Sequence, residues 1–414
     1  MRSAWRQVEG LLHDLAGEVD GWSIAQPAPG GFRSPVERPS PDFVAAAGSI
    51  PDTSFVLWDG ARLEAHVRQL QQILVDSGIA LSVGLKACAN VDVLRLLARC
   101  GIYADAQSMG ECDLAEAAGF GVLTATGPAF RPADVRELLS RNVLFDAQSV
   151  TQIDQLRALN VRSPVGLRIR VRLPDPLRHP DMRHSVSRFG IELSEDSIAQ
   201  VGASGLDIGR LRVHTGEALS ADVARTLEYR ALLGVALAGL FGSVNEINLG
   251  GGFLALSRDL PALRKAMERV GAVFEDAERC LDRPLHRWVE PGSALLLDSA
   301  YLISEVLDVD RANHAVTIAA SPWNLAPWAF STVFVLSGTE HWEFRGDVYG
   351  PALYENDRLR RTERYRQRGR LPNVGDRIAI SSFGAYTLVH GRTFGQIPLP
   401  PQYLFGNNTY KRVT

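Results

Sequence analysis

The sequence has few cysteines, and none is spaced for a metal site or a disulfide framework. Cys88, Cys100, Cys112 and Cys280 are its four cysteines, and they form no CxxC pair. This spacing excludes the usual zinc motifs and is typical of proteins from a reducing compartment. We therefore expect a cytoplasmic protein with no metal site.

The chain also lacks long apolar runs and an excess of charge of either sign. No stretch is apolar enough to span a bilayer, and the N-terminus carries charged residues early, with no apolar core behind them. The formal net charge is -3, which gives no indication of binding to nucleic acid or to an anionic membrane. These absences favour a soluble protein whose ligands are small molecules.

Apolar residues are plentiful, at 46% of the 414 residues, which is enough to bury a large core in more than one domain. Residues 1–23 predict an amphipathic helix docked on the surface, and the Pro/Gly-rich residues 26–35 predict a linker. Residues 53–58 predict a strand. Apolar residues at helical spacing from Leu63 to Ile73 predict the helix that follows it.

From about residue 80 to 292, short β-rich runs alternate with helical patterns, as in parallel strands joined by crossover helices. The runs lie at residues 81–85, 102–104, 122–125, 143–145, 165–171, 210–213, 246–249 and 287–289. Eight such units predict an α/β fold with a (β/α)8 barrel, in which functional residues gather at the C-terminal ends of the strands.

After Gly292 the pattern changes to β-rich runs without crossover helices, such as residues 303–309 and 315–319. This change predicts a second, β-barrel-like domain that the strand around Phe55 completes. We therefore expect three parts: residues 1–59 as a helix, linker and strand that joins the β domain, residues 60–292 as the barrel, and residues 293–414 as the C-terminal β domain.

Reactive or ligand-binding residues follow the predicted strands. Lys86 ends the first run, where lost hydration would lower the pKa of its amine and make it a nucleophile or Schiff-base former. The other strands end at Asp105, Asp146, Arg168 or Arg170, His214, Gly250–Gly252 and Glu290. Each has an ordinary explanation on its own, such as a solvent-facing lysine, a tight turn, a core histidine or a helix cap.

Together, these residues offer an amine for an aldehyde, bare backbone N–H groups for a phosphate, a flat ring to lie on a flat cofactor, and a carboxylate for a pyridinium proton. That combination is what a pyridoxal phosphate site requires.

Seven motifs occur in one order along the chain. They are L-K-A-C-A-N at residues 85–90, D-A-Q-S-M-G-E at 105–111, S-R-F-G-I at 187–191, H-T-G at 214–216, N-L-G-G-G-F at 248–253, E-P-G at 290–292 and G-A-Y-T at 384–387. In this order they resemble the motifs of fold-type III pyridoxal phosphate enzymes, specifically the ornithine/diaminopimelate decarboxylase family. The likeness covers most of residues 50–400. It implies pyridoxal 5'-phosphate as cofactor and decarboxylation of an amino acid through an external aldimine.

The resemblance also implies roles for single residues. Lys86 would carry the cofactor, His214 would stack on its pyridine ring, and Glu290 would pair with the pyridine nitrogen. The remaining cofactor-binding residues would be Asp105, Arg168, Gly250, Gly251, Gly252 and Tyr386. Lys86 and His214 would also act in catalysis.

Residues 350–357, G-P-A-L-Y-E-N-D, resemble the family's G-P-x-C-x-x-x-D segment, which a partner subunit inserts into the active site. The resemblance therefore implies a homodimer with shared active sites, in which Tyr354 and Asp357 take part in catalysis.

The chain departs from the family pattern at four places. Leu353 replaces a cysteine that helps to protonate the substrate carbon, Ser293 replaces the arginine of E-P-G-R, and Glu217 replaces the serine of H-x-G-S. Residues 325–328, L-A-P-W, stand where R-P-x-L-Y is expected, which removes an arginine that binds a substrate carboxylate. The substrate therefore differs from diaminopimelate, lysine and ornithine at its distal end. A modified amino acid or a carrier-linked aminoacyl group would fit.

Two of these departures require compensation. A buried Glu217 beside a phosphate needs an arginine partner or a displaced loop. Candidate partners are Arg168, Arg170, Arg172, Arg178 and Arg183, which could equally form a solvated basic face. With Leu353 in place of the cysteine, Lys86 or the partner's Tyr354 would return a proton to the substrate carbon.

Two other functions stay open. A racemase or epimerase on the same scaffold needs acid and base groups on both faces of the ring, and the missing cysteine weakens that hypothesis. A non-catalytic homologue would explain the altered phosphate contacts. However, such a protein has no need of Lys86, Glu290 and all three glycines.

Overall fold

The computed structural model describes residues 2–24, 38–182, 187–327, 329, 331–337, 340–359 and 369–413. The chain forms two compact units, the first comprising Met1–Pro29, Arg68–Leu85 and Gly101–Ala294, and the second Gly30–Val67, Lys86–Cys100 and Leu295–Thr414. The predicted linker at residues 26–35 lies outside the described residues. Among the helices of the described part, none combines the length and the apolar character needed to cross a membrane.

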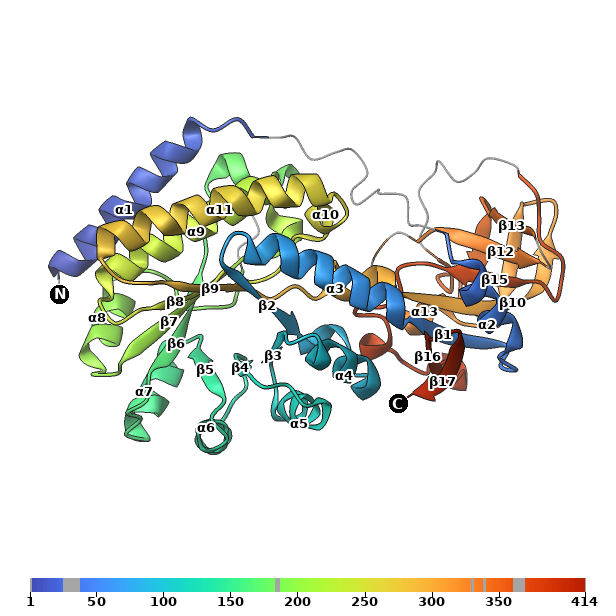
Figure 1. Cartoon of the computed structure of the whole chain (residues 1–414), viewed down its shortest axis with the longest axis horizontal. Coiled ribbons are helices and arrows are strands. Elements are labelled where there is room, and N and C mark those ends of the chain that lie inside the picture. Colours follow the sequence, from blue (N-terminus) through green and yellow to red (C-terminus); the bar gives the residue numbers. More distant parts are fainter. Residues whose placement is uncertain are drawn as a thin grey trace. The chain divides into compact units, whose positions relative to one another are not determined.

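Eight parallel strands close into a barrel in the first unit, which confirms the predicted fold (Figure 1). The strands are β2 (Ile79–Gly84), β3 (Tyr103–Ala106), β4 (Leu123–Ala125), β5 (Leu144–Ala147), β6 (Val165–Arg170), β7 (Ile208–His214), β8 (Glu246–Asn248) and β9 (His286–Val289). Each coincides with a predicted run to within a few residues. The strands read as apolar runs because both faces of a barrel strand are covered.

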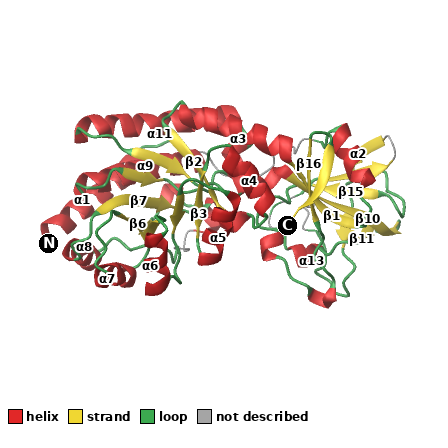
Figure 2. Ribbon diagram, turned by 60° about the horizontal axis from the view of Figure 1, so that its bottom comes forward, coloured by secondary structure: helices red, strands yellow, loops and turns green. Residues whose placement is uncertain are grey.

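Helices separate the strands along the chain, as a parallel barrel requires (Figure 2). They are α3 (Gly60–Val75), α4 (Val91–Arg99), α5 (Met109–Ala118), α6 (Pro132–Ser140), α7 (Val150–Ala158), α8 (Glu195–Ala203), α9 (Val223–Leu240), α10 (Leu254–Ser257) and α11 (Leu260–Leu281). Several starts are set by the local sequence. The side chains of Asn90, Ser108, Ser149 and Ser194 each accept a hydrogen bond from a backbone N–H in the first turn.

The predicted N-terminal helix forms α1 (Arg2–Asp20), which packs against α8 and α9 (Figure 1). Val8, Leu15 and Val19 are buried on one face of α1, at the spacing of an amphipathic helix. Just beyond the helix, the ring of Trp22 lies 5.0 Å from the guanidinium carbon of Arg225 on α9. The face and the aromatic contact fix this helix on the outside of the barrel.

The second unit is built on a nine-stranded sheet. Its strands are β1 (Ser54–Asp59), β10 (Ala300–Asp310), β11 (Ala315–Ile318), β12 (Val333–Ser337), β13 (Glu340–Glu343), β14 (Asp347–Tyr349), β15 (Arg377–Ile380), β16 (Gln402–Gly406) and β17 (Thr409–Val413). Strand β1, which contains Phe55, pairs antiparallel with β10 and parallel with β16, so it lies inside the sheet. Two short α-helices, α12 (Ser293–Leu296) and α13 (Pro322–Leu325), lie between strands of this part of the chain or just before them.

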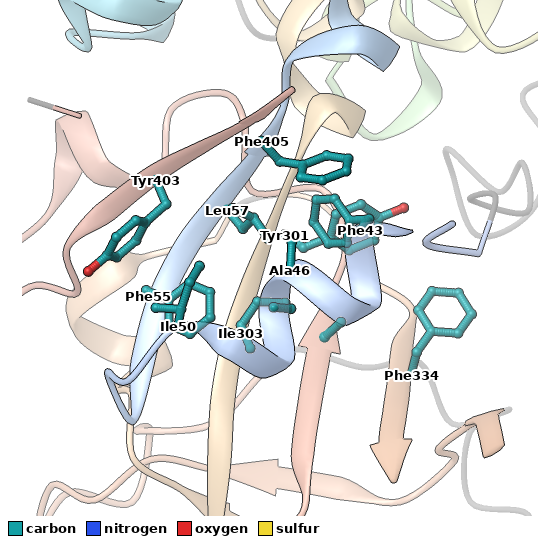
Figure 3. Packing of buried hydrophobic residues seen from close by; sticks show 12 residues of the cluster. Phe43, Ala46, Ile50, Phe55, Leu57, Tyr301, Ile303, Phe334, Tyr403 and Phe405 are labelled. Carbon is teal, nitrogen blue, oxygen red and sulfur yellow. The ribbon is translucent and has the colours of Figure 1, made fainter. Parts of the chain in front are cut away.

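Helix α2 (Pro41–Ser49) covers the core of this sheet (Figure 3). Phe43 on α2 packs edge to face with Phe405 on β16, with ring centroids 5.7 Å apart, and Phe55 packs similarly with Tyr403 at 5.6 Å. The guanidinium of Arg377 donates to the carbonyl of Ile50, 2.8 Å away, at the end of the helix. Residues far apart in sequence thus form one apolar core.

Candidate active site

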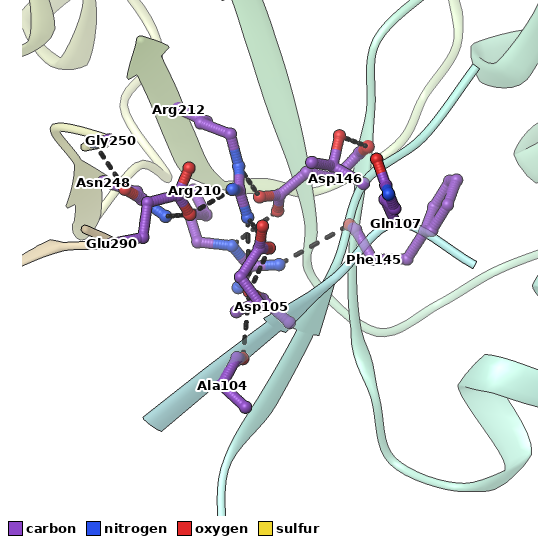
Figure 4. A network of polar contacts seen from close by, with 12 residues as sticks. Ala104, Asp105, Gln107, Phe145, Asp146, Arg210, Arg212, Asn248, Gly250 and Glu290 are labelled. Carbon is purple, nitrogen blue, oxygen red and sulfur yellow. Dashed lines mark hydrogen bonds and ion pairs between the residues drawn. The ribbon is translucent and has the colours of Figure 1, made fainter. Parts of the chain in front are cut away.

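A buried network of charges fills the barrel near the C-terminal ends of its strands, and Arg212 on β7 lies at its centre (Figure 4). Its guanidinium donates to Asp105 at 2.6 Å and to Asp146 at 2.8 Å, and it also donates to Glu290. Arg212 is 0% exposed. Burial would lower the pKa of Arg212, but the three carboxylates hold it well above its ordinary value. One cation therefore compensates three carboxylates from three other strands or strand ends.

Asp146 is held by a second arginine as well as by Arg212. Arg210 donates to it at 2.6 Å and to Glu246 at 3.0 Å. Burial alone would raise the pKa of Asp146, but Arg210 and Arg212 hold that pKa below its ordinary value. On the neighbouring strand, a Cβ at Gly166 would lie 1.8 Å from an Asp146 oxygen, so only glycine leaves room for this ion pair.

Glu290 and the glycine segment 250–252 are joined by Asn248, the last residue of β8. Its amide nitrogen donates to Glu290 at 2.9 Å, and its amide oxygen accepts from the N–H of Gly250 at 2.7 Å. Gly250 has a φ of +71°, and a Cβ there would lie 2.2 Å from the Nδ1 of His214. The segment therefore packs directly against His214 because it has no side chains.

The glycine segment offers donors that fit a phosphate group. The N–H groups of Gly251, Gly252 and Phe253 have no hydrogen-bond acceptor in the part of the chain that the structure describes. Successive bare N–H groups of this kind form an anion-binding concavity. Behind it, the buried Arg230 on α9 donates to the carbonyl of Gly251 at 2.9 Å, and burial lowers the pKa of this arginine to about 10.

Glu217 reaches the same segment. Its carboxylate accepts hydrogen bonds from the N–H groups of Leu254 at 3.0 Å and Ala255 at 2.9 Å. Burial raises the pKa of Glu217, although these two donors and the charges of Arg258 and Arg230 act in the opposite direction. Glu217 thus caps the chain just beyond the glycines.

Glu217 has arginines nearby, as expected, but they are Arg258 and Arg230 and none of the described candidates. Arg170 and Arg172 pair with Glu192, and Arg178 lies 3.3 Å from Asp175. The guanidinium carbon of Arg168 lies 5.0 Å from the ring centroid of Phe189, and its Nε has no acceptor among the described residues. Arg183 lies outside them. These arginines are close in sequence, but β6 ends at Arg170. The arginines beyond it, Arg172 and Arg178, pair with carboxylates other than Glu217.

Lys86 belongs to the second unit by its contacts. Strand β2 ends at Gly84, and Lys86 lies half-buried in the adjoining 3-10 turn, Leu85–Ala87. The carbonyl of Ala87 accepts a hydrogen bond of 2.9 Å from the N–H of Tyr386, whose φ is +61°. The G-A-Y-T motif is therefore fixed beside the turn that carries the lysine.

The segment 350–357 is organised around Asp357, which is 2% exposed. The Asp357 carboxylate accepts from the hydroxyl of Ser321 at 2.7 Å and from the N–H groups of Trp323 and Ala352, both at 2.9 Å. With these contacts Asp357 positions the residues between it and Gly350. Among them, Leu353 is fully exposed and Tyr354 is 38% exposed.

Three arginines of this region were missed from the sequence: Arg210, Arg212 and Arg230. Arg210 and Arg212 alternate with Leu211 and Val213 on a strand whose other residues are nearly all buried. That alternation was the available signal, because arginines on one face of a barrel strand must find carboxylates inside the barrel. Arg230 gives no comparable signal, since it lies within an apolar helix.

The part of the chain that contains this network matches a known family. Residues 61–296 match the family described as "Pyridoxal-dependent decarboxylase, pyridoxal binding domain", which is more than half of the chain. The chain belongs to this family. Its predicted resemblance, its activity class as a carboxy-lyase and its cofactor, pyridoxal phosphate, are thereby confirmed.

This decarboxylase has named relatives of similar length. It is 26% identical over 384 residues to a diaminopimelate decarboxylase of Deinococcus radiodurans, covering 87% of this chain and 92% of the relative. It is 25% identical over 278 residues to the L-glutamyl-(BtrI acyl-carrier protein) decarboxylase of Niallia circulans, covering 62% and 63%. A solved diaminopimelate decarboxylase of M. jannaschii in complex with L-lysine has a TM-score of 0.75 at 17% identity, covering 89% and 90%, and shares the fold.

Proposed function

We propose that this decarboxylase acts on an amino acid whose distal end is extended or masked, such as an amide, an ester or a thioester on a carrier. The proposal rests on residues 325–328, where the family arginine for a distal carboxylate is replaced. Leu325, which stands at that position, is 0% exposed, and Ala326 and Pro327 add no charge. Trp328 lies outside the described residues. The relative that acts on a carrier-linked glutamyl group supports this substrate class.

The residues of the charge network around Arg212 have different roles toward the cofactor. When bound, pyridoxal phosphate withdraws the electrons of the bond to the departing carboxylate. Glu290, held by Arg212 and Asn248, would keep a proton at the pyridine nitrogen, and His214 would lie against the ring. Asp105, fixed by the hydroxyl of Thr124 at 2.7 Å and by Arg212, sets the position of that arginine.

Lys86 would supply the amine that holds the cofactor's aldehyde. The N–H groups of Gly251 and Gly252 would bind its phosphate, and the N–H of Tyr386 holds the turn beside Lys86 by donating to the carbonyl of Ala87. Arg168, which keeps a donor without an acceptor among the described residues, is a further cofactor ligand.

A substrate panel tests this function. The purified enzyme, loaded with pyridoxal phosphate, is incubated with diaminopimelate, lysine, ornithine, glutamate and pantetheine thioesters or amides of glutamate, and released carbon dioxide is measured. We expect turnover with at least one derivative, at a rate well above that with any free diamino acid. Diaminopimelate as the best substrate would contradict the proposed substrate class, and exchange with amino acids without gas would point to racemisation.

Tyr354 is our candidate for the proton donor to the substrate Cα after carbon dioxide leaves, since Leu353 has no proton to give. Replacing Tyr354 with phenylalanine should lower kcat by about a hundredfold and leave the Kd for pyridoxal phosphate unchanged. The matched control is Tyr349→Phe, which removes the hydroxyl of another partly exposed tyrosine (36%) at the start of the same loop. Unchanged turnover and product stereochemistry in Tyr354→Phe would leave Lys86 as the donor.

The exposed position of Leu353 and Tyr354 supports the proposal that this loop enters a partner's site in a homodimer. If so, mixing Lys86→Ala chains with Tyr354→Phe chains should restore activity, because one of the two sites in a mixed dimer then has both native residues. Sedimentation reports the dimer directly. Mixed dimers without restored activity would place Tyr354 in the site of its own subunit.

A further inference from the structure

The main-chain donors of the glycine segment continue without interruption into the residues that Glu217 binds. The N–H groups of residues 251–253 have no acceptor among the described residues, whereas those of Leu254 and Ala255 both donate to the Glu217 carboxylate. Five successive donors thus form one row. An internal carboxylate holds two of them, and the other three are left for a ligand.

Glu217 cannot be far from a phosphate bound at these donors. A Cβ at Gly252 would lie 3.0 Å from the backbone nitrogen of Glu217 and 3.5 Å from its Cα, so the two segments are in contact. Both carboxylate oxygens are used on the adjacent turn. A dianionic phosphate at the remaining three donors would therefore lie beside a carboxylate in a partly buried setting.

The negative charges of the phosphate and the Glu217 carboxylate would repel each other strongly there, because little water is present to screen them. The cations that face Glu217 are Arg258, just after α10, and Arg230 on α9, and both already act on its carboxylate. Arg230 is 1% exposed, donates to the carbonyl of Gly251, and its Nε has no acceptor in the described part of the chain. This buried cation lies against the glycine segment and can compensate one anion there more readily than two.

We propose that the Glu217 carboxylate opposes binding of the cofactor's phosphate. In the cofactor-free enzyme it holds the two donors that follow the three left for the phosphate, and it must be protonated or displaced when the phosphate binds beside it. The inference rests on the proposed function, in which the glycine segment binds that phosphate. It assigns to Glu217 a part in cofactor affinity that the serine of H-x-G-S does not have, because a hydroxyl carries no charge.

Titrations of the cofactor-free enzyme test this proposal through binding rather than activity. Pyridoxal phosphate and its unphosphorylated form, pyridoxal, are titrated by absorbance into the wild type, Glu217→Ser and Glu217→Gln. We expect both variants to bind pyridoxal phosphate about tenfold more tightly at pH 7.5, with pyridoxal affinity unchanged. This advantage should shrink as the pH falls, because protonation removes the same charge from the wild type.

The matched control is Glu228→Gln on α9, which removes a partly buried carboxylate paired with Arg225 and Arg269. Its affinity for pyridoxal phosphate should stay within about twofold of the wild type. Unchanged or weaker binding in both Glu217 variants, or an equal gain for pyridoxal, would overturn the proposal.

A thermal-shift series with inorganic phosphate separates this inference from the proposed function. If Glu217 opposes phosphate binding, phosphate should raise the Tm of Glu217→Ser and Glu217→Gln at about tenfold lower concentration than it does for the wild type. If the proposed function failed, no variant would attach pyridoxal phosphate covalently, yet this series would still report on Glu217. Equal phosphate responses in all variants would overturn the inference alone.

Discussion

Replacing Lys86 with alanine is expected to abolish covalent attachment of pyridoxal phosphate and to lower the rate of carbon dioxide release by at least about a thousandfold. The physical reason is that Lys86 is the only lysine in the turn that directly follows β2, the first barrel strand. The lysine is half-buried in a tight turn, so its replacement should change the fold little. Borohydride reduction and then peptide mass analysis report attachment, and gas release reports turnover.

The composition of the chain makes this test unusually clear. Only three lysines are present, Lys86, Lys265 on α11 and Lys411 on β17. The matched controls are Lys265→Ala and Lys411→Ala, which remove exposed amines and should leave attachment and turnover unchanged. Cofactor fixed at either of these lysines, or turnover near the wild-type rate in Lys86→Ala, would refute the assignment of Lys86.

Replacing Arg212 with methionine should cost at least about 3–5 kcal/mol of unfolding free energy. Methionine keeps much of the side-chain length but removes the cation that Asp105, Asp146 and Glu290 share. Three carboxylates would then remain buried without the cation that donates to all of them. Urea unfolding of the cofactor-free protein, monitored by circular dichroism, measures the loss.

Arg141 provides a matched control, because it also lies within ion-pair distance of three carboxylates, those of Asp113, Glu116 and Glu137. These partners are more than half exposed, so Arg141→Met should cost less than about 1 kcal/mol. The two variants remove the same kind of ion pairs and differ in whether the carboxylates are buried or exposed. Similar losses in the two variants would show that the buried network contributes no more than a surface cluster.

The stabilities of the wild type and of Arg212→Met should respond to pH in opposite directions. In the wild type, the depressed pKa of Asp146 contributes stability that is complete above the ordinary value of 3.8 and is lost as the pH falls through the lower folded value. In Arg212→Met, Asp146 loses one of its two guanidinium partners, so its pKa rises. The destabilisation is then greatest above that raised value, and the gap to the wild type should narrow as the pH is lowered from about 8 to about 5.

The alternative functions are affected differently by the findings. Membership of the decarboxylase family and the retained donors of the glycine segment speak against a non-catalytic homologue. The racemase hypothesis depends on acid and base groups on both faces of the ring, and the substrate panel tests it by the fate of the carboxylate.

The barrel could be predicted, and candidate site residues could be proposed, because their signals are local. Eight apolar runs separated by helical patterns are read directly along the chain, and parallel strands bring the residues at their C-terminal ends to one end of a barrel. Lys86, His214, Gly250 and Glu290 could therefore be proposed as site residues from position and residue type. The cofactor was inferred from their order.

The partners of the charged residues could not be predicted in the same way. Glu217 was expected to pair with arginines of the 168–183 stretch, yet it binds main-chain N–H groups of Leu254 and Ala255. Arg168 and Arg170 lie on β6, next to the strand that precedes Glu217, but the carboxylate of Glu192 engages Arg170 and Arg172.

By itself, the sequence determined the fold class, the cofactor and the order of the functional residues, because each depends on spacing along one strand, turn or helix. Only the tertiary structure decided that Arg212 joins Asp105, Asp146 and Glu290, and that Glu217 caps the residues just beyond the glycine segment. The physical reason is that closing the barrel brings side chains of different strands within hydrogen-bonding distance, as with Arg212 and Asp105 at 2.6 Å. Coulomb energy at that distance depends on register and burial, which no single stretch of sequence specifies.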